Sequence, residues 1–115
     1  MRVLLAENFP MPLMKDFIGD ECAHVISLGW EGTFNGDLLT KAEEAGFDVL
    51  VTFDSEIPVE NDLTDRSIAV YVVQPEGQGV KATRVLISEI LLALQSCKHG
   101  QVSTFSNRTR RRLPD

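Results

Sequence analysis

Short apolar runs alternate along the chain with segments of helical periodicity. The run at residues 47–54 is rich in β-branched and aromatic side chains, which is typical of a buried parallel strand. Similar runs predict further strands at residues 2–6, 22–28, 67–73 and 101–105, the last of them at an edge of the sheet. Apolar residues at helical spacing predict helices at residues 10–18, 37–46 and 80–97, with Asn35 or Asp37 as the N-cap of the second helix.

This alternation of strands and helices predicts an α/β fold. We expect a mostly parallel sheet of about four to five strands, with helices on its faces and right-handed crossovers between strands. Residues 59–66 are polar and predict a loop or a single helical turn. The helix at residues 80–97 has an apolar face so broad that we expect it to pack on the sheet and on either a second helix or a partner chain.

The overall composition suits a globular protein with one core. The chain has 115 residues, of which 43% are hydrophobic, and its formal net charge is -6. An acidic balance argues against a non-specific nucleic-acid binder, because phosphate contacts need Lys and Arg. It does not exclude a metal-dependent nuclease, whose carboxylates contribute to such a balance.

The last nine residues differ in composition from the rest. Residues 107–115 carry four arginines and almost no apolar side chains, so we expect a folded domain over residues 1–106 and a disordered basic tail. The tail is either a basic arm for RNA or terminal sequence without a role. Cys22 and Cys97 predict two reduced, partly buried thiols in a cytoplasmic protein. No signal peptide and no apolar run of membrane-spanning length is visible, so we expect no membrane association.

Acidic residues lie at the ends of the first and third predicted strands and at the start of the helix at residues 37–46, which all approach the edge of a parallel sheet where ligands bind. They are Glu7, Asp37, Asp54 and Glu56. Carboxylate oxygens are the ligands that Mg²⁺ and Mn²⁺ prefer, and such ions promote attack on a phosphodiester. The alternative interpretation is structural, with Asp54 capping a turn after its strand.

Several short motifs resemble the small PIN-like proteins of bacteria. They lie at residues 1–10, 28–32, 35–39 and 48–54, and the likeness extends over nearly the whole chain before the arginines. The resemblance implies a three-layer α/β/α PIN-like fold and cleavage of RNA with Mg²⁺ or Mn²⁺. It also implies a place as the toxin of a toxin–antitoxin pair, beside a small DNA-binding antitoxin.

The resemblance also implies roles for individual residues. It assigns catalysis and metal binding to Asp37, Asp54 and Glu56, and a further metal contact to Glu7. It assigns positioning of the substrate or of water to Asn8 and Thr52.

One position departs from the family pattern. Ala6 stands where the family has its first aspartate, and alanine offers no oxygen to a metal. Loss of one carboxylate from such a site weakens cation binding strongly. Three explanations stay open: a natural degenerate member, substitution by Glu7 from the neighbouring position, and an engineered replacement. We therefore expect reduced or lost ribonuclease activity in this chain.

Two other functions compete with the ribonuclease. The first is a catalytically inactive PIN-like module that acts through an antitoxin or as a homodimer. The second is a phospho-acceptor domain with Asp54 as acceptor, which lacks the lysine expected at the end of a late strand. Among the remaining polar residues we expect His24 to be structural, and Trp30 to pack on the edge of the core rather than stack on a base.

Overall fold

A computed structural model describes residues 1–107, so the predicted disorder of the arginine-rich tail falls outside the described residues from position 108 onward. Five parallel strands form one sheet in the order β2-β1-β3-β4-β5, which confirms the predicted α/β fold. Their bounds are β1 Arg2–Leu5, β2 Glu21–His24, β3 Val49–Thr52, β4 Ala69–Gln74 and β5 Val102–Ser106.

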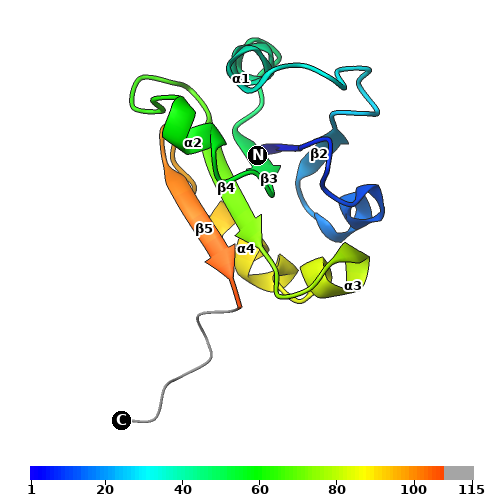
Figure 1. The fold of residues 1–115 in the computed structure, drawn as a ribbon. Helices are drawn as coiled ribbons and strands as arrows, with labels where there is room; N and C mark the ends of the chain where they lie inside the picture. Colours follow the sequence, from blue (N-terminus) through cyan, green and yellow to red (C-terminus); the bar gives the residue numbers. More distant parts are fainter. Residues whose placement is uncertain (108–115) are drawn as a thin grey trace.

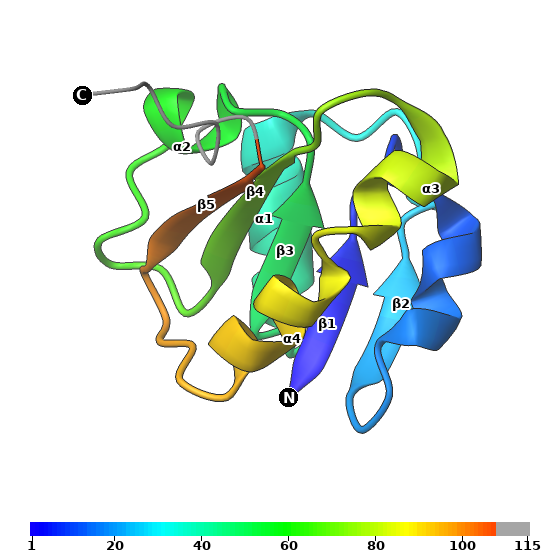
Figure 2. The ribbon, with the colours of Figure 1, turned by 90° about the horizontal axis from the view of Figure 1, so that it is seen from below.

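Helices cover both faces of the sheet, which gives three layers (Figures 1 and 2). One face carries α1 (Asn35–Glu44) and α2 (Ile57–Glu60). The other face carries the 3-10 helix η1 (Met11–Asp16) together with α3 (Gly79–Arg84) and α4 (Ile87–Leu94). The sheet has one hydrophobic core on each face. Successive side chains of a strand point to opposite faces, so Leu4 packs in the core on the α1 side and Leu5 in the core on the α4 side.

Several predicted boundaries were wrong, each for a local reason. The second strand ends at His24 rather than at residue 28, because the ring of His24 accepts the backbone N–H of Ile26 and the chain turns there. The segment after Pro10 is a 3-10 helix and not an α-helix; Pro12 in its first turn has no N–H to donate.

The long helix predicted for residues 80–97 is divided into α3 and α4. The hydroxyl of Thr83 donates to the carbonyl of Gly79 at 2.8 Å, a back-bond that bends helices, and Leu86 N–H then bonds only three residues back, to Thr83. Leu86 is buried at this break. The predicted N-cap of α1 was also wrong, because the cap residue is Phe34 and no side chain caps the helix.

Glu43 joins the end of α1 to the segment that enters β4. Its carboxylate accepts hydrogen bonds from the guanidinium of Arg66 at 2.6 Å and from the backbone N–H of Ser67 at 2.7 Å. Burial raises the pKa of this carboxyl, but the bonds from Ser67 and Arg66 outweigh burial and hold the pKa below its ordinary value. The ionised form is therefore favoured by folding.

Replacement Glu43→Gln is expected to lower the free energy of unfolding at neutral pH by about 1–2 kcal/mol. Since the folded pKa is lowered, this stabilisation is present above the unfolded pKa of about 4.3 and is lost as pH falls through the folded value. Urea titrations from pH 7 to pH 3 should show the variant losing less stability on acidification than the parent. Glu44→Gln, at an exposed neighbouring position, is the matched control, and equal pH dependence of all three chains would contradict the assignment.

Candidate functional site

The order of the strands creates a crevice at one edge of the sheet. The chain leaves β1 toward β2 and then returns to β3 on the other side of β1, so the connections after β1 and β3 diverge. Ligands of open α/β sheets bind at such a point, beyond the carboxyl ends of the strands. A cavity of about 180 Å³ lies there. Its walls come from β3, α1, α2 and the loops that follow β1, β2 and β3: Ala6, Glu7, Asn8, Val25, Thr33, Asn35, Leu38, Thr52, Phe53, Asp54 and Ile57.

Asp54 lies at the cavity wall and is held by its neighbours. The backbone N–H of Glu56 donates to Oδ1 at 2.8 Å, and Nδ2 of Asn35 approaches Oδ2 at 3.4 Å. The backbone N–H of Asp54 donates to Oγ1 of Thr52 at 3.0 Å. Since Thr52 is only 2% exposed, this bond fixes the direction in which the chain leaves β3. The structural turn at Asp54 is present, and the carboxylate still lines the cavity.

Ala6 occupies the corresponding position just after β1. Its N–H donates to the carbonyl of Val51 at 2.9 Å, which extends the pairing of β1 with β3 by one residue. The methyl group is 7% exposed and lines the cavity together with Thr52. A longer side chain at this position would extend into the space that Asp54 also lines.

Glu7 and Asn8 complete the wall on the β1 side. Oε1 of Glu7 accepts the backbone N–H of Gly32 at 2.8 Å, which ties the loop after β2 to the cavity. The side chain of Asn8 is exposed and makes no hydrogen bond within residues 1–107. Asn8 is therefore available to a ligand, whereas one oxygen of Glu7 is already used.

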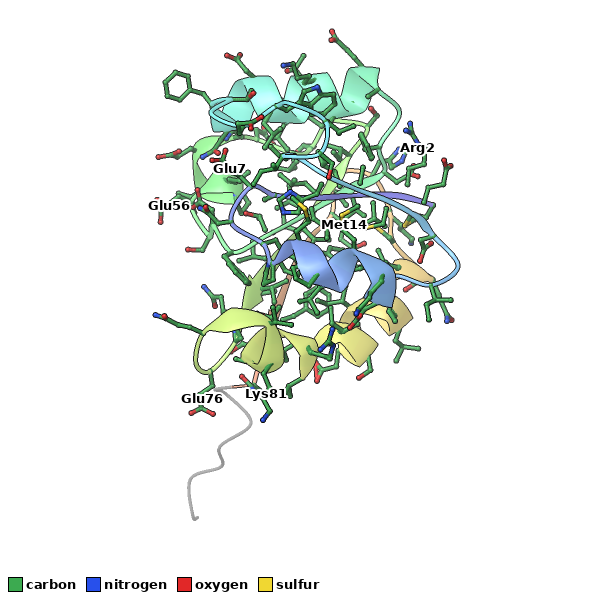
Figure 3. All side chains as sticks on the ribbon, turned by 90° about the vertical axis from the view of Figure 1, so that its right-hand side faces the viewer. Arg2, Glu7, Met14, Glu56, Glu76 and Lys81 are labelled. Carbon is green, nitrogen blue, oxygen red and sulfur yellow. The ribbon has the colours of Figure 1, made fainter. Side chains whose placement is uncertain are left out.

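Asp37 and Glu56, which the sequence placed in the metal site, do not line the cavity. Both side chains are exposed, Asp37 in the first turn of α1 and Glu56 just before α2. Glu56 nevertheless lies at the same end of the molecule as Glu7, opposite Arg2 at the start of β1 (Figure 3). Of the six predicted site residues, the cavity wall includes Glu7, Asn8, Thr52 and Asp54.

Two polar residues of the wall were missed. Asn35 was expected only as a helix cap, but its amide reaches Asp54 instead. Thr33 lines the cavity with its hydroxyl bonded to the carbonyl of Trp30 at 2.6 Å. The signal for Asn35 was its place beside Gly36 and Asp37 in one of the family-like motifs; nothing in the sequence marked Thr33.

The donor set of the cavity suits a hard divalent cation. It offers two carboxylates, two side-chain amides and two hydroxyls, and neither His nor Cys lines the wall. Mg²⁺ is commonly held by one or two carboxylates with water and substrate phosphate completing its shell. Residues 1–107 contain no group of three or more His, Cys, Asp or Glu side chains placed to hold a metal ion. An ion held here would therefore have few protein ligands and would bind weakly.

His24 is a structural residue, as predicted. It is fully buried, its Nε2 lies 2.7 Å from the carbonyl of Phe9, and its Nδ1 accepts the N–H of Ile26 at 3.1 Å. Since Nδ1 is an acceptor, the proton is on Nε2, which donates to Phe9. Both nitrogens are thus occupied in holding the chain segments that leave β1 and β2.

Trp30 packs on the edge of the core, as expected. Its ring meets that of Phe47 edge-on at 6.2 Å between centroids, on the α1 side of the sheet. Cys22 and Cys97 are free and half-buried, in line with the sequence. Burial raises the pKa of Cys22 to about 11 and also raises that of Cys97, so neither thiol is an activated nucleophile.

None of the helices within residues 1–107 combines the length and apolar character required to cross a bilayer. Comparison with known proteins returned no match among protein-family models, curated proteins or solved structures.

Proposed function

We propose that the chain is a PIN-like endoribonuclease that uses Mg²⁺ or Mn²⁺, acts as the toxin of a toxin–antitoxin pair, and is weakened by Ala6. The observation that supports this is the cavity at the crossover point of the sheet, where Glu7 and Asp54 converge from different strands. Two carboxylates that line one open space are ligands that a divalent cation can use, and such a cation can accompany an RNA phosphodiester.

The residues of the chain have distinct tasks in this proposal. Thr52 holds the backbone of Asp54, and Asn35 together with the Glu56 N–H orients its carboxylate. Asn8 has a free amide that can donate to a phosphate oxygen. Asp37 and Glu56 lie outside the cavity wall, so the proposal gives them no contact with the ion and counts them only as exposed acidic residues.

Asp54 and Glu7 would hold the ion, with amide oxygens of the wall as weaker ligands. When bound, such an ion offsets the charge of the phosphodiester and lowers the pKa of water. The carboxylates alone supply neither effect. Because the wall has two carboxylates and one of them is bonded to Gly32, we expect low affinity and slow cleavage.

Replacement Asp54→Asn is expected to abolish any Mn²⁺-dependent cleavage of single-stranded RNA and to weaken Mn²⁺ binding at least tenfold (~1.4 kcal/mol). Fluorescent RNA in gel assays and isothermal titration with Mn²⁺ provide the two measurements. Asp62→Asn is the matched control, since Oδ1 of Asp62 accepts the N–H of Thr64 at 2.9 Å in the same type of turn but does not line the cavity. Equal losses of Mn²⁺ affinity in both variants, or an unchanged Mn²⁺ affinity in Asp54→Asn, would contradict the proposal.

A PIN-like module that is inactive and works through an antitoxin or a homodimer is the second candidate. Apolar side chains on the α3–α4 side favour it: Ile18 is 83% exposed, Val85 63% and Leu92 67%. Ile18 also borders a groove with Leu91 of α4. A groove bordered by apolar side chains such as Ile18 and Leu91 is a feature of interaction surfaces. Sedimentation of the isolated chain distinguishes a homodimer from a monomer.

A further inference from the structure

A second cavity, of about 490 Å³, lies beyond the ends of β3 and β4 on the α3 side of the sheet. Phe53, the end of β4 and the loop at residues 75–79 form its walls. Figure 3 shows Glu76 of this loop beside α3, across the sheet from α1. The cavity is thus on the opposite face from Ala6 and α1, but at the same edge of the sheet as the first cavity.

Phe53 joins the two cavities, because it is a wall residue of both. It directly precedes Asp54, so an aromatic ring and the carboxylate of the first cavity are neighbours along the chain. The ring is supported by Phe9, whose centroid is 5.0 Å away at an interplanar angle of 39°. A ligand bound at Asp54 can therefore extend over a ring that is held in place.

Two amides supply the polar part of the second cavity. Gln74 ends β4 and Gln78 precedes α3, and both line the wall. Neither side chain has a hydrogen-bond partner among the residues that the structure describes. Each amide both donates and accepts, and this is the chemistry required to read the edge of a nucleobase.

The loop between these amides depends on glycine. Gly77 and Gly79 have φ of 104° and 89°, which side-chain-bearing residues rarely adopt. No heavy atom lies within 4 Å of the place that a Cβ would take at Gly79, so space here is open and the requirement for glycine is in the backbone. Gly77, which lies between the two glutamines, therefore adds no side chain to the wall that both of them line.

We propose that this second cavity binds the base of the nucleotide adjoining the phosphate at Asp54, with Phe53 stacking on the base and Gln74 and Gln78 reading its edge. The inference rests on the proposed ribonuclease function, and it assigns to that enzyme a source of base preference. Aromatic stacking plus amide contacts is how single-stranded RNA is usually bound. The apolar and amide-bearing wall suits a base better than a second phosphate, because no Lys or Arg within residues 1–107 lines it.

The test compares ligands that differ only in the base, with a chelator present so that no metal chemistry contributes. Adenosine and uridine 5′-monophosphates and ribose 5-phosphate are titrated into the full chain and followed by NMR. We expect at least one nucleotide to bind fivefold or more tightly than ribose 5-phosphate. The double variant Gln74→Ala/Gln78→Ala should lose that difference, whereas Gln95→Ala, directly after α4 and outside the wall of this cavity, should keep it.

Equal binding of the nucleotides and ribose 5-phosphate would overturn the inference, as would an unchanged preference in a double variant whose thermal unfolding matches that of the parent. Both results are independent of RNA cleavage. If nucleotides bind here but no variant of the chain cuts RNA, the ribonuclease is refuted and the base site stands. If RNA is cut with no effect of the double variant on base preference, the reverse holds.

Discussion

Replacement Ala6→Asp is expected to raise the affinity of the chain for Mn²⁺ about thirtyfold and to produce measurable RNA cleavage. The new carboxylate would enter the cavity that Glu7 and Asp54 line. Two unit charges about 4 Å apart attract by ~1 kcal/mol even in bulk water, hence ~2 kcal/mol for a divalent ion. Since ~1.4 kcal/mol corresponds to tenfold, the gain is roughly thirtyfold, and a drier environment would increase it.

The same substitution carries a cost that gives a second measurement. Position 6 is 7% exposed, so an unpaired carboxylate there is poorly hydrated and is repelled by Asp54. In chelator, Ala6→Asp should therefore lower the free energy of unfolding by about 1–3 kcal/mol, and Mn²⁺ should restore it.

The matched control is Ala6→Asn, which has nearly the shape of aspartate but no charge. It should bind Mn²⁺ far more weakly than Ala6→Asp and should show little rescue of stability by metal. If Ala6→Asp and Ala6→Asn respond identically to Mn²⁺, the cavity is not a cation site. If Ala6→Asp binds the ion and cuts no RNA, the ion site stands and the ribonuclease is refuted.

Replacement His24→Leu is expected to destabilise the fold by roughly 4 kcal/mol. The change leaves the carbonyl of Phe9 and the N–H of Ile26 without their partner at a fully buried position, and each orphaned group costs about 1–3 kcal/mol. Urea unfolding at neutral pH measures the loss. Because Asn8 and Val25 of the cavity wall adjoin these two groups, we also expect weaker Mn²⁺ binding in the fraction that stays folded.

His99→Leu serves as the control for this prediction. His99 is largely exposed and its Nε2 lies 3.1 Å from Oδ1 of Asp48, so its loss should cost less than about 1 kcal/mol. A loss below ~1 kcal/mol in His24→Leu as well would show that these backbone groups find other partners, and that His24 does not fix the loops.

The fold was predictable because strands and helices of this chain have clear periodic patterns. The apolar runs around Leu4, Leu50 and Val70 form the central strands, and all three side chains are fully buried. The interruption of the last long helix was not predictable from the apolar stripe. It depends on the hydroxyl of Thr83, which donates a hydrogen bond to the carbonyl of Gly79 in its own helix. The spacing of apolar residues does not reveal such a bond.

The candidate site was predictable in part. Position along the chain was enough to predict that four residues lie at one end of the sheet, because each follows or ends a strand whose direction is fixed in a parallel sheet. These residues, which line the cavity, are Glu7, Asn8, Thr52 and Asp54. It did not predict that Asp37 and Glu56 lie outside the cavity wall, because the placement of their exposed side chains depends on where α1 and α2 begin. Asn35 was predicted only as a possible N-cap of α1. Phe34 holds that position in the structure, and the amide of Asn35 contacts Asp54 instead.

The all-parallel sheet also decides where a fusion partner can be attached. Every strand runs toward the end of the sheet that bears both cavities, so Met1 and the end of β5 lie at opposite ends of the strands (Figure 2). Met1 is 42% exposed, and its ammonium lies 3.8 Å from Asp20. A reporter or purification tag joined ahead of Met1 would leave the cavities accessible at the expense of that weak ion pair, whereas immobilisation after β5 would begin from the end of the sheet that bears both cavities.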